Sequence, residues 1–204
     1  EYSGLMSDAS APNNNITGTS DMNPVREQIQ LFTKLGITID KIGMIYCSTE
    51  SNSIIQRDLA QDAADEFGLE FVFETFAETN QIGSAMDSLI EKGIDGIYTP
   101  TDSTLVSVYS TVHSKADAAQ IPIIAGEEAC LELGAVATLS INYFDLGKLT
   151  GEMAVQVLNG KAISELPVLQ LEEVPLVLHL GNAEDIGLTF PEELLEQADR
   201  VIDN

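Results

Sequence analysis

Polar residues that can bind a small molecule follow a short apolar run near the start of the chain. The run is Lys41-Ile-Gly-Met-Ile-Tyr-Cys47, and its composition is typical of a strand buried on both faces. A strand that leads through a polar turn into a helix gathers backbone N–H groups and the positive end of a helix at one point. Such a point binds small polar or anionic groups. The residues offered here are Ser48, Thr49, Ser51, Asn52 and Ser53, of which Ser51 or Asn52 could instead serve only as a helix cap.

Polar side chains also follow other apolar runs. In an open parallel sheet, ligands bind outside the carboxyl ends of the strands, so we expect these side chains to share one edge. Each set could equally consist of caps and turns. The candidates are Thr101, Asp102 and Ser103 after a run at 94–99, Glu127 and Glu128 after 121–125, and Asn142 and Tyr143 after 136–141.

An amino-acid zwitterion matches this set of groups. The hydroxyls and N–H groups of the 48–53 stretch suit a carboxylate. Asp102 is the first choice as partner of the ammonium group, with Glu127 or Glu128 as the alternative. Tyr143 could stack on an aromatic side chain. A sugar is the rival ligand, since hydroxyls and carboxylates also bind polyols.

Catalytic signatures are missing from the sequence. It contains no GxGxxG, no P-loop and no GxSxG motif, so we expect no enzyme activity and no cofactor. Cys47 and Cys130 lack metal-ligand or redox spacing, and we expect both to be buried and no metal to be bound. Two-carboxylate chemistry by Asp102 with Glu127 or Glu128 stays open as an alternative.

Strand and helix patterns alternate along the middle of the chain. This spacing predicts an α/β fold, a parallel sheet sandwiched by helices. A predicted helix over 24–35, capped by Asn23, precedes the alternating part of the chain. Beyond Gly160 the pattern changes to extended segments at 168–171 and 174–180. Within the second segment, Pro175 indicates an edge or crossing strand. The predicted strands are 42–47, 69–74, 94–99, 121–125 and 136–141; the predicted helices are 53–67, 80–91, 103–119, 144–159, 182–186 and 191–199.

The composition is strongly acidic. Nine Lys and Arg stand against 33 Asp and Glu, a formal net charge of −24. Such a surface repels phosphate backbones, so we expect no nucleic-acid partner. No apolar run is long enough to span a membrane. Because the chain opens at Glu1 without Met or a signal peptide, we expect a processed or trimmed piece.

Five motifs together resemble the ABC-transporter substrate-binding proteins of the type I periplasmic-binding fold, in the group with tryptophan- and tyrosine-binding members. The motifs extend over nearly the whole chain. They are Asn15-Ile-Thr-Gly-Thr-Ser-Asp21, Tyr46-Cys-Ser-Thr-Glu-Ser-Asn-Ser53, Ile97-Tyr-Thr-Pro-Thr-Asp102, Tyr143-Phe-Asp-Leu-Gly147 and Glu184-Asp-Ile-Gly-Leu-Thr-Phe-Pro191.

The resemblance implies two α/β lobes that clamp a ligand, with most of the first lobe absent. On this basis, residues 1–22 are a remnant of the first lobe and hinge, and 23–141 form the second lobe. Residues 142–166 carry a helix of the first lobe, and 167–204 cross back and complete the second. The 144–159 helix should expose apolar residues such as Met153 and Val157, which would permit a homodimer of the fragment.

The resemblance also implies a biological role. Such proteins deliver a small molecule, here an amino acid, to the membrane permease of an ABC importer. They work in the bacterial periplasm or outside the cell, with the full-length form anchored as a lipoprotein. Family members often carry Asn where Ser103 stands and Asp where Asn142 stands, so Asn142 lacks a charge that an ammonium group could use. An effector-sensing domain of a transcription regulator is the alternative that shares this fold.

Overall fold

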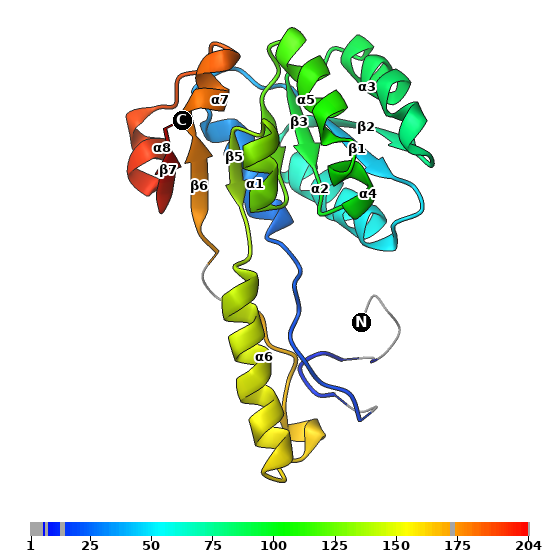
Figure 1. Ribbon diagram of the computed structural model, residues 1–204, viewed down its shortest axis with the longest axis vertical. Helices are drawn as coiled ribbons and strands as arrows, with labels where there is room; N and C mark the ends of the chain where they lie inside the picture. The colour runs from blue at the N-terminus through cyan, green and yellow to red at the C-terminus, as the bar shows by residue number, and fades with distance from the viewer. Residues whose placement is uncertain (1–5, 7, 13–14, 172–173, 204) are drawn as a thin grey trace. The chain divides into compact units, whose positions relative to one another are not determined.

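The computed structural model describes residues 6, 8–12, 15–171 and 174–203 (Figure 1). Its helices and strands alternate along the middle of the chain, as expected. In chain order they are α1 (Val25–Leu31), η1 (Phe32–Lys34), β1 (Lys41–Cys47), α2 (Ser51–Phe67), β2 (Glu70–Phe76), η2 (Thr79–Gln81), α3 (Ile82–Glu91), β3 (Gly96–Thr99), α4 (Ser103–Val106), α5 (Tyr109–Ala118), β4 (Ile123–Ala125), η3 (Glu128–Leu133), β5 (Ala137–Leu139), α6 (Tyr143–Leu158), η4 (Ile163–Glu165), β6 (Leu176–His179), α7 (Leu180–Asp185), α8 (Glu192–Gln197) and β7 (Arg200–Ile202), where η denotes a 3₁₀ helix.

The chain divides into two compact units. Unit 1 comprises Glu1–Asn23 and Ile141–Val174, and unit 2 comprises Pro24–Ser140 and Pro175–Asn204. Residues 1–5, at the start of the segment expected to be a first-lobe remnant, lie outside the described residues. None of the described helices is long and apolar enough to cross a membrane.

Unit 2 is built on a mostly parallel seven-stranded sheet in the order β2-β1-β3-β4-β5-β6-β7. The pairs from β2 to β5 are all parallel, so their carboxyl ends lie at one edge. β6 pairs antiparallel with β5, and β7 pairs parallel with β6. This architecture confirms the predicted α/β class.

Two hydrophobic clusters cover the two faces of the sheet. One contains residues of α1, α2 and α8, and the other contains residues of α3, α5 and η3, so helices lie on both faces (Figure 1). Strand β1 supplies both clusters, because successive side chains of a strand point to opposite faces. Its Met44 and Tyr46 belong to the first cluster, while Ile45 and Cys47 belong to the second. Cys47 and Cys130 are buried, as predicted, and form no disulfide bond with one another.

A buried polar pair joins α1 to the sheet inside the first cluster. The Tyr98 hydroxyl donates to Oε1 of Gln28 at 2.7 Å, and the Gln28 amide donates to the Leu139 carbonyl at 2.6 Å. Both side chains are fully buried. Burial raises the pKa of Tyr98, so its hydroxyl keeps its proton and remains a donor.

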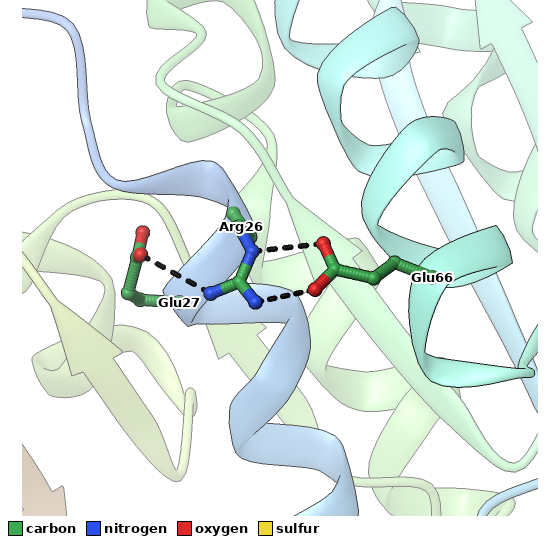
Figure 2. A network of polar contacts seen from close by, with 3 residues as sticks. All are labelled: Arg26, Glu27 and Glu66. Carbon is green, nitrogen blue, oxygen red and sulfur yellow. Dashed lines mark hydrogen bonds and ion pairs between the residues drawn. The ribbon is translucent and has the colours of Figure 1, made fainter.

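An exposed ion pair joins α1 to α2 on the surface (Figure 2). Arg26 donates from Nε to Glu66 at 2.8 Å and from a terminal nitrogen at 2.5 Å, and it lies 3.5 Å from Glu27. Its guanidinium also lies 5.0 Å from the centre of the Phe67 ring. Because these charged side chains are about half exposed, the ion pair contributes little by itself.

The end of the chain differs from the prediction at Pro175. We expected an edge or crossing strand there, but β6 is an interior strand between β5 and β7. Pro175 precedes the first residue of β6, so its missing N–H removes no bond from the ladder. The edge is formed by β7, a three-residue strand that we did not predict. The extended segment 168–171 contains only an isolated bridge between Leu169 and Thr19 among the described residues.

Two helix predictions also need correction. The segment 103–119 is broken into α4 and α5, because Val108 adopts a non-helical conformation with φ −122° and ψ 16°. Asn23 does not cap α1. The helix begins after Pro24, whose carbonyl accepts from the Gln28 N–H at 2.9 Å.

Unit 1 is organised around α6. Thr17 donates to the Leu166 carbonyl at 2.6 Å, and its hydroxyl also contacts the sulfur of Met153 at 3.9 Å. Met153 is only 3% exposed and Val157 is half-buried, so the expectation is wrong for these two residues. The reason is that extended segments of unit 1, which the helix pattern alone does not reveal, lie against this part of α6. The helix does expose other apolar side chains, those of Phe144, Val155 and Leu158.

Candidate functional site

The carboxyl ends of β1, β3 and β4 bring three acidic side chains close enough to influence one another. Glu50 follows β1, Asp102 follows β3 and Glu127 follows β4. The charges of Asp102 and Glu50 both act on Glu127, and the charge of Glu50 also acts on Asp102. We call Glu50, Asp102 and Glu127 the acidic cluster.

Asp102 is the internal member of the acidic cluster. Its side chain caps α4 by accepting from the Leu105 N–H at 2.8 Å. The other oxygen accepts from the Cys47 N–H at 2.7 Å and from the Ser53 hydroxyl at 2.9 Å. Burial raises the pKa of Asp102 despite these hydrogen bonds, and Asp102 and Ser53 are both completely buried. Asp102 therefore positions the loops and is not an accessible partner for a ligand in this structure.

Glu50 is an acidic residue that our sequence-based site omitted. Oε1 of its half-buried side chain accepts from the Thr104 N–H at 2.9 Å and from the Thr104 hydroxyl at 2.7 Å. Burial acts to raise its pKa, but hydrogen bonding, chiefly from Thr104 and also from Asp102 and Ser103, outweighs burial, so the pKa lies below the ordinary value. Its position within the polar stretch after β1 was the available signal.

Glu127 and Glu128 have different environments although they are adjacent. Glu127 is half-buried, and burial followed by the charges of Asp102 and Glu50 raises its pKa. Glu128 forms a close ion pair with Arg200 at the start of β7. Of the two glutamates considered as alternatives to Asp102, Glu127 thus belongs to the acidic cluster, whereas Glu128 is paired with Arg200.

The polar stretch after β1 has an exposed side and a buried side. Ser48, Thr49, Ser51 and Asn52 are exposed, whereas Ser53 points inward to Asp102. No side chain caps α2 in this structure, since neither Ser51 nor Asn52 is its N-cap residue. The Asn52 amide instead donates to the Thr101 carbonyl at 2.8 Å, which joins the loops after β1 and β3.

The loop after β3 contacts both α2 and the loop after β4. Thr101 is half-buried and its N–H donates to Oε1 of Gln56 at 3.1 Å, while Ser103 is exposed at the start of α4. A Cβ atom on Gly126 would lie 2.9 Å from the nitrogen of Thr101. Only glycine permits this close approach, which brings the loop after β4 against the loop after β3.

Asn142 and Tyr143 belong to unit 1. The Asn142 side chain caps α6 by accepting from the N–H groups of Phe144 at 2.9 Å and Asp145 at 3.2 Å. Tyr143 is 53% exposed at the first position of that helix. Asn142 therefore has a structural role as the cap of α6. A role in ligand binding remains a prediction for both Asn142 and Tyr143.

The edge of unit 2 offers negative charge beside hydroxyl groups and a helix start. Such a set can accept hydrogen bonds from an ammonium group and donate hydrogen bonds to a carboxylate. Among the described residues, no three His, Cys, Asp or Glu side chains are arranged to hold a metal ion. Together with the mostly parallel sheet, these side chains occupy the edge at which α/β proteins with open sheets bind their ligands.

The chain matches the family of ABC transporter substrate-binding proteins over residues 3–202, and it belongs to this family. It is similar to a tyrosine-binding protein of Clostridioides difficile (strain R20291), with 36% identity over 176 residues, which are 86% of this chain and 51% of that protein. The chain thus spans about half the length of this curated relative.

Solved structures are similar over nearly the whole chain. A domain from Streptococcus pneumonia in complex with L-Trp is 33% identical, with a TM-score of 0.87 over 98% of this chain and 68% of the other. A ligand-free, open structure of a substrate-binding protein with adhesive properties from Clostridium difficile is 32% identical, with a TM-score of 0.80 over 98% of this chain and 67% of the other. These matches confirm the family resemblance found in the sequence motifs.

Proposed function

We propose that this chain is part of the solute-binding receptor of an ABC importer and that its ligand is an amino acid with an aromatic side chain. Membership of the substrate-binding family supports the first part. The tyrosine-binding relative and the L-Trp complex support the second. The receptor delivers its ligand to a membrane permease, works in the periplasm or outside the cell, and is anchored as a lipoprotein in its full-length form.

The observation that carries the amino-acid assignment is the half-buried carboxyl group of Glu127 beside Glu50 and Asp102. Burial raises the pKa of Glu127, and repulsion from the charges of Asp102 and Glu50 raises it further. A ligand ammonium group placed there relieves this repulsion and replaces water as a charged hydrogen-bond partner. Glu127 therefore takes the ammonium role first assigned to Asp102.

The ligand carboxylate is assigned to the exposed stretch after β1. Ser48, Thr49 and Ser51 contribute hydroxyls, and the start of α2 contributes backbone N–H groups. Α2 is 17 residues long, so its dipole adds to the attraction for an anion. An acidic edge beside a helix start thus complements the two ends of a zwitterion.

Titration of the 204-residue chain by two-dimensional NMR tests this proposal. L-Tyr and L-Trp should shift backbone amide signals of residues 48–53, 101–103 and 126–128 in a saturable manner, because these loops contain the proposed contacts. Tyramine, which lacks the carboxylate, and 3-(4-hydroxyphenyl)propanoate, which lacks the ammonium group, should bind at least tenfold more weakly. A pentose or hexose that binds more tightly than every amino acid would overturn the assignment.

A further inference from the structure

A separate cavity of about 290 Å³ lies in unit 2 between the η1–β1 connection and α8. None of its lining residues belongs to the loops that carry the acidic cluster. Lys34 lines it from η1, and Glu193 and Gln197 line it from α8. Its volume is at the lower end of the range of small-molecule pockets, about 300–1,000 Å³.

The floor of this cavity is preformed. Gly36 has φ +82°, and a Cβ atom there would lie 2.7 Å from Cγ of Pro191, so the backbone of Gly36 lies directly against the Pro191 ring. The Pro191 carbonyl accepts from the Leu194 N–H at 3.0 Å, and Leu194 is 2% exposed within the hydrophobic core. These contacts hold the Gly36 and Pro191 side of the cavity in place.

Lys34 stands out among the cations of unit 2. All the others have a carboxylate partner at ion-pair distance: Arg26, Lys41, Arg57, Lys92, Lys115 and Arg200. Within the described part of the chain, Lys34 forms no such pair, although the chain carries 33 acidic residues. Glu193 lines the same cavity and likewise has no cationic partner among the described residues.

We propose that this cavity binds a short zwitterion of amino-acid to dipeptide size, with its carboxylate at Lys34 and its ammonium group at Glu193. A simple anion would be attracted by Lys34 and repelled by Glu193, and a simple cation would be attracted by Glu193 and repelled by Lys34. A ligand that carries both charges can pair with both side chains. The Gln197 amide can donate to or accept from the ligand backbone. Because the charged groups are in contact with solvent, we expect a dissociation constant of roughly 1–10 mM.

Titration of the 204-residue chain with glycylglycine, followed by two-dimensional NMR, tests the proposal. The amide signals of Gly36 and Leu194 should shift in a saturable manner. Acetate and methylammonium, each with one of the two charges, should bind at least fivefold more weakly. Shifts at these two amides are distinct from shifts in the loops after β1, β3 and β4, so this site can fail or succeed independently of the proposed receptor site.

Variants identify the contacts. Lys34→Ala and Glu193→Gln should each weaken glycylglycine binding at least fivefold. Glu196→Gln removes an exposed charge from the same helix without touching the cavity lining, and it should leave the affinity within twofold. The absence of saturable shifts at 50 mM glycylglycine would overturn the proposal, as would equal binding by acetate or an equal effect of Glu196→Gln and Glu193→Gln.

Discussion

Oδ2 of Asp102 accepts a hydrogen bond from the backbone nitrogen of Cys47 at 2.7 Å. This bond joins the end of β1 to the start of α4 across 55 residues of sequence. The Ser53 hydroxyl reaches the same oxygen at 2.9 Å, so a single buried carboxyl group holds the two loops of the proposed site together.

Asp102→Ala should therefore destabilise the fold. The change leaves the N–H groups of Cys47 and Leu105 without their acceptor and removes the cap of α4. Each buried group left unpaired costs about 1–3 kcal/mol, so we expect a loss of at least about 2 kcal/mol in the free energy of unfolding. Urea unfolding monitored by circular dichroism measures this loss. Asp62→Asn, at an exposed position of α2, is the control, and equal stabilities of the two variants would contradict the role assigned to Asp102.

The pH dependence of stability should report on Glu127. Burial and the charges of Asp102 and Glu50 raise its pKa above the ordinary value of 4.5. The folded state therefore keeps this proton to higher pH than the unfolded state, and ionisation lowers stability as pH rises through 4.5 and above. Below the ordinary pKa, both states are protonated and the penalty disappears.

Glu127→Gln should consequently raise the melting temperature at pH 7 and leave it nearly unchanged at about pH 3.5. Differential scanning calorimetry across this range gives both values. Glu132→Gln, an exposed change on the same 3₁₀ helix, should show no such pH-dependent gain. A Glu127→Gln variant that melts lower than the parent at pH 7 would refute the repulsion described above.

The buried pair between Gln28 and Tyr98 predicts an asymmetry between two substitutions. Gln28→Leu leaves both the Tyr98 hydroxyl and the Leu139 carbonyl without their partner. Tyr98→Phe removes one hydroxyl and leaves only Oε1 of Gln28 unsatisfied. At about 1–3 kcal/mol for each group left unpaired, Gln28→Leu should cost roughly twice as much as Tyr98→Phe. Chemical unfolding curves of both variants measure the ratio, and a larger cost for Tyr98→Phe would count against this network.

The surface contact between Arg26 and Glu66 should behave differently from these buried contacts. A double-mutant cycle with Arg26→Ala and Glu66→Ala should give a small coupling energy that falls further at about 1 M salt, where the screening length is about 3 Å. The single change Arg26→Ala should still lower the melting temperature at high salt, because its contact with Phe67 is also lost. A coupling that does not respond to salt would contradict the exposed character of this pair.

Sequence patterns predicted the elements with long, regular signals. Strand β1 and helix α2 were identifiable, as 42–47 and 53–67, because burial on both faces and a 3.6-residue period leave clear traces. Helix α2 begins two residues earlier than predicted, at Ser51. Strand β7 was missed because Arg200–Ile202 lies at the sheet edge, exposed or half-buried, and lacks the apolar run that marks the equally short β4 and β5. Its pairing with β6 makes it a strand.

The roles of individual acidic residues were much harder to predict. Asp102 and Glu127 both follow strands and both precede helical turns, so the sequence treats them alike. Asp102 accepts a hydrogen bond from Cys47, which lies 55 residues away in the sequence. Of the two adjacent glutamates, Glu128 pairs with Arg200, 72 residues away, and Glu127 does not. Such long-range contacts determine which carboxyl group is buried, paired or available, and they are absent from any local pattern.

Binding of L-Tyr and L-Trp to the Glu127→Gln variant tests the central claim most directly. Isothermal titration calorimetry at pH 7 should show at least tenfold weaker binding than for the parent chain, or about 1.4 kcal/mol, because the acceptor for the ammonium group has lost its charge. Glu132→Gln should bind within twofold of the parent. Affinity for both amino acids that is unchanged by Glu127→Gln, in a variant that remains folded, would contradict the assignment of Glu127 as the ammonium partner.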